Sequence, residues 1–261
     1  FMGSSTGDLL VDSDAALENI FKECNKVIAI HSEDEAILKK IAEKGIGDSF
    51  TDHPSARPVE AAVTSTVKAI NLALKYKKRL HVLHLSTAEE VEIIRKHKST
   101  NLITAETTPQ HLLLEAPDIY QKMGALGTMN PPIRTKRHQQ GLWEGILDGT
   151  IDCIATDHAP HTLEEKKLPY GQAPAGMPGV ETSMPLMLNE VNKGRIKIQQ
   201  VVKWMCENPA LVYKIKNKGF LKPGYDADIT IVDMNLSKII DGSKMQSKCG
   251  WSAFDGTKTK G

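Results

Sequence analysis

The chain has 261 residues, of which 25% are charged, and its formal net charge is +1. A chain of this length can bury a sizeable core as one large domain or two ordinary ones. The balanced charge, with no basic stripe, argues against nucleic acid as a partner, and no apolar run approaches the ~20 residues that a membrane span needs.

The cysteine pattern bears on the compartment of the protein. Its four cysteines are far apart in the sequence and include no C-x-x-C pair. This spacing excludes zinc-finger motifs, and a disulfide framework is not expected in a chain of this length. We therefore expect a protein of the reducing cytoplasm.

Short apolar or β-branched runs alternate with amphipathic segments over the first 155 residues. Asp12 or Ser13 is placed to cap the first helix, and Thr87, with Glu90 three residues later, to cap the fourth. The alternation of strand and helix predicts parallel strands covered by helices, an α/β fold. In chain order we expect helix Asp14–Cys24, strand Val27–Ile30, helices Asp34–Ala42 and Pro58–Tyr76, strand Leu80–Leu83, helix Ala88–His97, strand Leu102–Ala105, helix Lys136–Leu147 and strand Ile151–Ala155.

The remainder of the chain falls into two parts of different composition. From Glu181 it is helical through about Lys214, with a break near Asn192–Gly194. The stretch GFLKPGYDADITIVDMN then combines turn residues with the β-rich run Ile229–Val232. We predict a boundary that separates residues 1–216 from residues 217–261. Neither FMGSSTGDLL at the start nor FDGTKTKG at the end reads as a complete element, and we expect a portion of a longer polypeptide.

Three of the expected strands end in side chains that can bind a metal ion. His31 and His84 directly follow two strands, and Asp157 follows another after one threonine. In a parallel α/β barrel the carboxyl ends of the strands face one shared site. Two imidazoles and a carboxylate suit Zn²⁺ or a similar cation. A lone histidine at a strand end is more often only hydrogen-bonded, so the pattern alone leaves both interpretations open.

The other histidines give weaker signals. His81 lies three residues before His84 and on a strand points to the opposite face, so we assign it a structural role. His53, His97 and His138 lie in polar helical or loop contexts, and we assign them no function. His111 follows a strand end, and its role stays open. We expect a structural role for His158.

Two loops add polar groups near the same edge. In TMNPPIR, the pair Pro131-Pro132 stiffens the backbone and would hold Asn130 in a fixed position. In APAGMPGVET, at residues 173–182, the glycines let backbone amides approach a ligand closely. Either loop taken alone is compatible with an ordinary connection.

Several motifs together resemble the dihydroorotases of the amidohydrolase superfamily, of the bacterial class I type. They run over nearly the whole chain in a fixed order. The Asp-x-Ala-Pro-His form separates dihydroorotases from relatives that resemble hydantoinases and allantoinases. The motifs are HSEDE at His31, HVLHLST around His84, TPQHLLL at Thr108, MNPPIR at Met129, TDHAPHT at Thr156, GVET at Gly179, KPGYDADITIVD and CGWSAFDG.

This resemblance implies a fold and a reaction. The fold would be a TIM-like (β/α)8 metal-dependent hydrolase barrel, with its C-terminal portion in residues 1–216 and part of a small β-sandwich in residues 217–261. The reaction would be the reversible hydrolysis of the cyclic amide dihydroorotate to N-carbamoyl-L-aspartate, in cytoplasmic de novo pyrimidine biosynthesis. A homodimer is compatible with the resemblance.

The resemblance also implies roles for individual residues. His31 and His84 match the histidines that bind one ion of a binuclear Zn²⁺ centre. Asp157 matches the aspartate that binds the other ion and serves as the catalytic base. Asn130 and His161 match substrate-binding positions, as do Ala175 and Gly176 through their backbone.

The sequence departs from the family pattern at its start. The His-x-His pair of the first barrel strand, the arginine that follows it and the ligand that bridges the two ions have no counterpart among these 261 residues. Two other functions therefore stay open. One is another cyclic amidohydrolase of the hydantoinase, dihydropyrimidinase or allantoinase kind, against which His161 speaks. The other is a non-catalytic dihydroorotase-like scaffold.

Overall fold

A computed structural model describes residue 11 and residues 13–261. The first ten residues and Asp12, the alternative cap of the first helix, lie outside this description. Ser13 caps that helix, α1 (Asp14–Glu23), because its side chain accepts a hydrogen bond from the amide of Ala16. The helix begins where the sequence predicts it.

Four parallel strands form the central sheet, in the order β1 (Ile28–Ile30), β2 (Leu80–Val82), β3 (Ile103–Thr107) and β4 (Cys153–Ile154). In the register, Ile28 lies beside Leu80, which lies beside Ile103. Each strand pairs with its predecessor along the chain, which is the strand order of a (β/α) barrel. The predicted α/β class and all four predicted strands are confirmed.

Helices occupy most of the connections between these strands. Among the residues that the structure describes, none of the helices is long and apolar enough to cross a membrane. Besides α1, they are α2 (Glu35–Glu43), α3 (His53–Ala56), α4 (Val59–Tyr76), α5 (Ala88–His97), α6 (Pro109–Leu113), α7 (Asp118–Met123), α8 (Lys136–Asp148), α9 (Leu163–Lys166), α10 (Ser183–Asn192), α11 (Ile198–Val202) and α12 (Asn208–Tyr213), with a π-helical turn at Lys203–Glu207 and 3-10 turns at Phe50–Asp52, Lys98–Thr100, Gly124–Gly127 and Gly242–Lys244.

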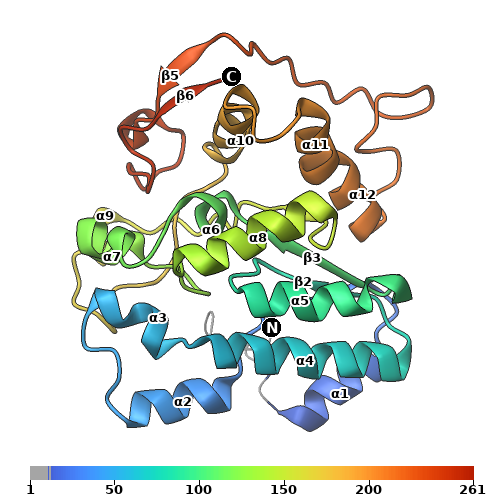
Figure 1. The fold of residues 1–261 in the computed structure, drawn as a ribbon, viewed down its shortest axis with the longest axis vertical. Coiled ribbons are helices and arrows are strands. Elements are labelled where there is room, and N and C mark those ends of the chain that lie inside the picture. The colour runs from blue at the N-terminus through green and yellow to red at the C-terminus, as the bar shows by residue number, and fades with distance from the viewer. Residues whose placement is uncertain (1–10, 12) are drawn as a thin grey trace.

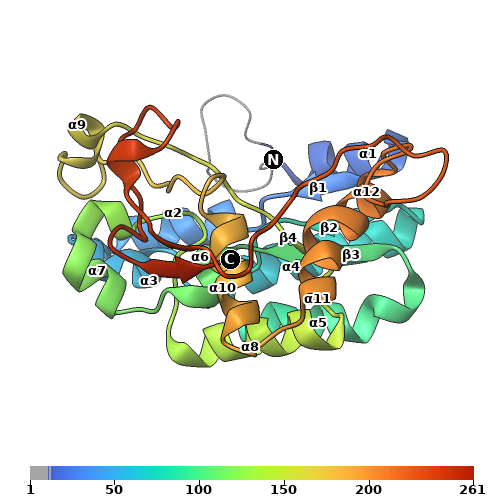
Figure 2. The same ribbon diagram turned by 90° about the horizontal axis from the view of Figure 1, so that it is seen from above.

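One face of the sheet is covered by α4, α5 and α8, which follow one another side by side (Figure 1). Seen from above, α5 and α8 lie on the same side of β2 and β3 (Figure 2). Leu80 and Val82 of β2 belong to the same buried core as Val91 and Ile94 of α5. Successive strand side chains point to opposite faces, so His81 lies on the face away from these helices.

The C-terminal part returns to the body of the molecule. Strands β5 (Ser237–Ile239) and β6 (Lys258–Lys260) pair antiparallel, and β6 packs against α10. Ile240, Trp251 and Phe254 share a second buried core with Leu186 of α10. The predicted division at residue 217 stays a prediction.

The expected strand at Ile229–Val232 is not formed. This run has no strand assignment among the described residues, and the side chain of Ile231 is 93% exposed. A strand needs a hydrogen-bonded neighbour, and β-branched composition alone does not supply one. The prediction of a strand here is wrong for the described part of the chain.

Candidate active site

The predicted metal ligands lie beyond the carboxyl ends of their strands. His31 directly follows β1, His84 comes two residues after β2, and Asp157 comes three residues after β4. Because these strands are parallel, their carboxyl ends share one edge of the sheet. His84 and Asp157 have φ angles of 29° and 42°. Positive φ is uncommon outside glycine and often marks functional positions.

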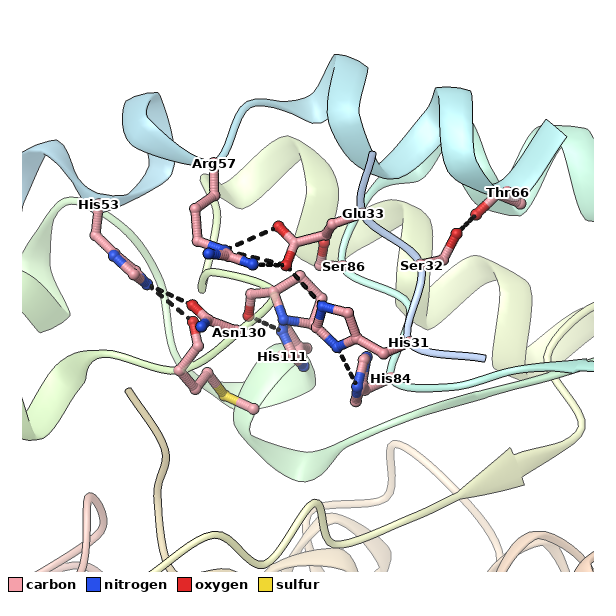
Figure 3. Close-up of polar contacts among 12 residues, drawn as sticks. His31, Ser32, Glu33, His53, Arg57, Thr66, His84, Ser86, His111 and Asn130 are labelled. Atoms are coloured by element: carbon pink, nitrogen blue, oxygen red, sulfur yellow. Dashed lines mark hydrogen bonds and ion pairs between the residues drawn. The ribbon is translucent and has the colours of Figure 1, made fainter. Parts of the chain in front are cut away.

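His31 and His84 meet directly. Nδ1 of His31 lies 3.1 Å from Nε2 of His84, and both side chains are buried (Figure 3). Two nitrogens bound at ~2.1 Å to one tetrahedral zinc ion would lie about 3.4 Å apart. Burial and the neighbouring His31 lower the pKa of His84, which favours the neutral form that a metal ligand must have. This pair therefore fits one shared metal ion.

A buried carboxylate orients the His31 ring. Nε2 of His31 donates to Oε2 of Glu33 at 2.9 Å, and Nε of Arg57 donates to both Glu33 oxygens at 3.1 and 3.0 Å (Figure 3). Burial by itself raises the pKa of Glu33, but Arg57 and His31 hold this pKa well below its ordinary value. The ionised carboxylate accepts the Nε2 proton and leaves the Nδ1 lone pair turned toward His84. Glu33 is not among the residues predicted from the sequence, although HSEDE places a carboxylate two residues after the histidine.

Asp157 does not form one group of ligands with the two histidines. Its side chain is half-buried, and its negative charge only partly offsets the burial and the neighbouring His31 that lower the pKa of His84. Among the described residues, no group of three or more His, Cys, Asp or Glu side chains is arranged to hold a metal ion. The structure thus unites two of the three predicted ligands, and the role of Asp157 as a ligand stays a prediction.

Two of the four predicted substrate residues line a neighbouring cavity. Asn130 and Ala175 line a cavity of about 500 Å³, together with His53, Arg57 and Tyr170. This location agrees with a role in binding a small molecule.

Gly176 and His161 lie against each other. Gly176 has a φ of +147°, and a Cβ atom there would lie 2.7 Å from the carbonyl oxygen of Ala159 and 3.0 Å from Nε2 of His161. Only glycine permits this approach. The amide of Gly176 donates to the carbonyl of Thr128 at 2.9 Å, so its contribution to a ligand would come through the carbonyl.

His53 is the main correction among the histidines. Its polar context in the sequence predicts no function, yet it is only 6% exposed and lies in the cavity wall. Nε2 of His53 lies 3.0 Å from the carbonyl oxygen of Met129 and 3.1 Å from Oδ1 of Asn130, and its Nδ1 lies 3.0 Å from the hydroxyl of Tyr170. Burial lowers the pKa of His53 to about 4. The sequence carries no local signal for these contacts, which join residues more than 70 positions apart.

The open assignment of His111 is resolved by its two partners. Its Nδ1 lies 2.9 Å from the hydroxyl of Thr108, and its Nε2 lies 3.0 Å from the carbonyl of Pro131. Burial lowers the pKa of His111 to about 3. The neutral ring therefore supports the loop that carries Asn130.

Other histidines have the structural roles expected of them. The ring of His81 joins the hydroxyl of Thr104 to the carboxylate of Glu106 on β3. Nδ1 of His158 accepts hydrogen bonds from the amides of Gly179 and Val180. These contacts hold neighbouring backbone segments in place.

Comparison with known proteins defines the class. The sequence profile of the amidohydrolase family matches residues 10–258, so the chain belongs to this family. Its similarity to dihydroorotases is also confirmed. It is 38% identical to a dihydroorotase of Methanosarcina acetivorans over 98% of this chain, and 36% identical to a dihydroorotase of Pyrococcus furiosus over 100% of this chain. The chain spans 57% of the length of each of these relatives.

Solved structures support the same class. The L-hydantoinase (dihydropyrimidinase) of Arthrobacter aurescens superposes with a TM-score of 0.93 and 32% sequence identity. The match covers 99% of this chain and 60% of that one. The parallel strands and covering helices are thus those of a TIM-like amidohydrolase barrel.

Proposed function

We propose that the protein is a dihydroorotase, which reversibly hydrolyses the cyclic amide of dihydroorotate to N-carbamoyl-L-aspartate in pyrimidine biosynthesis. The observation that carries this proposal is the buried His31–His84 pair beside a cavity lined by Asn130 and Ala175. The similarity to dihydroorotases over the whole chain supports it. We also propose a cytoplasmic location, and a homodimer is compatible with the proposal.

The donor set fits zinc. His31 and His84 would hold one ion, and a second ion would complete a binuclear centre in the full active site. Bound zinc would supply a Lewis acid for the amide carbonyl and lower the pKa of water toward ~7. Glu33 keeps the His31 ring in the tautomer that offers Nδ1 as the ligand atom.

The remaining steps belong to the side chains of this chain. Asp157 would accept the proton of the attacking water and deliver it to the ring nitrogen when the amide bond breaks. Asn130 and His161 would donate hydrogen bonds to oxygen atoms of the substrate, whose carboxylate suits such donors. Ala175 would contribute its backbone at the cavity wall.

A hydantoinase is the second candidate, because the superposed structure bears that name. Both reactions hydrolyse cyclic amides, so they differ in the substrate that the cavity accepts. The carboxylate of dihydroorotate has no counterpart in an unsubstituted hydantoin, and His161 and Asn130 are suited to bind it. A non-catalytic scaffold would show neither activity.

Turnover of the zinc-loaded protein tests the proposal. We expect hydrolysis of dihydroorotate to exceed that of hydantoin. The substitution Asp157→Asn should lower kcat by about 10²- to 10⁴-fold, because it removes the proton acceptor. Asp118→Asn removes an exposed carboxylate from α7 and should leave kcat unchanged. Preference for hydantoin, or near-normal turnover by Asp157→Asn, would contradict the proposal.

A further inference from the structure

The contacts of His53 determine its tautomer. A backbone carbonyl can only accept a hydrogen bond, so the contact between Nε2 and the Met129 oxygen requires a proton on Nε2. Burial lowers the pKa of His53 to about 4, so at neutral pH Nδ1 carries no proton. Nδ1 must then accept the hydrogen bond from the hydroxyl of Tyr170. His53 is therefore a donor on one side and an acceptor on the other.

The same tautomer determines which end of the Asn130 amide faces the ring. Oδ1 of Asn130 lies 3.1 Å from Nε2 of His53, the protonated nitrogen, which is where an acceptor belongs (Figure 3). A side-chain amide that presents its oxygen to His53 must turn its NH₂ group elsewhere. Within the part of the chain that the structure describes, that NH₂ group has no protein acceptor, and Asn130 lines the cavity.

We propose that Tyr170 and His53 form a positioning relay, which holds the Asn130 NH₂ group toward the cavity as a donor for a substrate oxygen. The proposal deepens the dihydroorotase assignment and rests on it for the identity of the substrate. Neither His53 nor Tyr170 needs to touch the substrate. They select for a ligand that presents an acceptor, such as a carboxylate or carbonyl oxygen, where Asn130 lies.

The surroundings restrict movement of the relay. His53 holds the carbonyl of Met129, and His111 holds the carbonyl of Pro131, so the backbone is fixed on both sides of Asn130. The ring of Tyr170 also packs edge-on against Phe50, with centroids 5.5 Å apart. Tyr170 precedes Ala175 in the same loop, so its hydrogen bond also ties this part of the cavity wall to His53.

A double-mutant cycle tests the relay in the zinc-loaded protein. Tyr170→Phe removes one hydroxyl and keeps the ring, and we expect it to raise KM for dihydroorotate about 3- to 10-fold with kcat nearly unchanged. In an Asn130→Ala background the same change should have no further effect, because the relay then has nothing to position. Tyr76→Phe is the matched control, since the Tyr76 hydroxyl bonds Glu18 on the helical layer.

A pair of substitutions at His53 separates positioning from packing. His53→Gln keeps an NH donor and should retain most of the affinity, whereas His53→Leu should raise KM at least as much as Tyr170→Phe. Equal KM values for the two variants would overturn the proposal. Additive effects of Tyr170→Phe and Asn130→Ala would overturn it as well.

A spectroscopic measurement makes the relay testable without turnover. Long-range ¹H–¹⁵N correlation spectra report which nitrogen of each histidine ring carries the proton. The signals of His53 are those that the His53→Gln spectrum lacks. They should show an Nε2–H tautomer at neutral pH. An Nδ1–H tautomer would overturn the relay even if the enzyme is active. Absence of dihydroorotate turnover in the unmodified protein would instead reject the proposed function and leave the tautomer result to decide the relay.

Discussion

The two paired histidines are oriented in different ways. His31 is held by the ionised Glu33, whereas Nδ1 of His84 is buried with no hydrogen-bond partner among the described residues. The backbone at His84 has a φ of 29°, a conformation that residues other than glycine seldom adopt. A buried nitrogen without a partner costs about 1–3 kcal/mol. The residues around the site are thus arranged to present ring nitrogens at some expense in stability.

The buried neutral histidines predict sensitivity to acid. The pKa of His53 is about 4 in the folded protein and near 6.5 when the ring is exposed. The unfolded chain therefore binds the proton first as pH falls. The stability that neutral His53 contributes is fully present above pH 6.5 and is lost as pH falls toward 4. A full loss corresponds to roughly 3 kcal/mol.

Urea unfolding at several pH values measures this effect. We expect His53→Gln to flatten the dependence of the unfolding free energy on pH between 6.5 and 4. His97→Gln, a half-buried position at the end of α5, serves as the control and should keep the wild-type slope. Identical slopes for wild type and His53→Gln would show that His53 is not held neutral by the fold.

At the scale of elements, a glycine sets the distance between α5 and α8. A Cβ atom on Gly141 of α8 would lie 2.5 Å from Cβ and 3.0 Å from Cα of Ala88, the first residue of α5. Real Cβ atoms essentially never come as close as 2.5 Å to another such atom, so the helices would have to separate. The close approach brings both helices onto the core formed by Ile94 and Leu142.

Gly141→Ala should therefore destabilise the protein although alanine favours helix. Helix propensity gains about 1 kcal/mol, while overpacking of a fixed contact costs roughly 1–3 kcal/mol. We expect a net decrease in Tm by thermal unfolding. Gln140→Ala, an exposed neighbour on the same helix, should leave Tm equal or higher. An increased Tm for Gly141→Ala would show that α5 and α8 can separate without loss.

At the scale of the whole molecule, distant segments close around the site. The indole of Trp251 donates to the carbonyl of His161 at 2.8 Å, and the ammonium of Lys166 lies 5.5 Å from the Trp251 ring. Figure 2 shows the loop with α9 beside this C-terminal segment. The loop that contains His161 is thus held by residues some 90 positions later.

Metal removal tests the site as part of the folded molecule. Zinc that binds only the folded state at 100 times its Kd adds about 2.7 kcal/mol of stability. For a chain of this size we expect a Tm higher by roughly 5–10 °C with zinc than after chelation. His31→Ala should abolish most of this gain, and His97→Ala should keep it. An equal gain in both variants would place the ion elsewhere.

The sequence by itself determined the local elements of this protein. Alternating apolar runs predicted the four strands, because the period of side-chain burial is local information. His31 and His84 could be named as partners because parallel strands bring their carboxyl ends together. The same reasoning fails at Ile229–Val232. The composition of this run favours a strand, but a strand forms only where a neighbouring strand can hydrogen-bond to it.

Only the tertiary structure decided how the site is supported. Glu33 and Arg57 are 24 residues apart, and His53 and Tyr170 are 117 apart. A buried hydrogen bond between such positions leaves no periodic signal in the sequence, so His53 reads there as one polar residue in a loop. Its burial and its three partners exist only once α3, the 128–134 loop and the 167–177 loop have packed together. The chain thus specifies its candidate ligands locally, whereas their orientation is a property of the assembled fold.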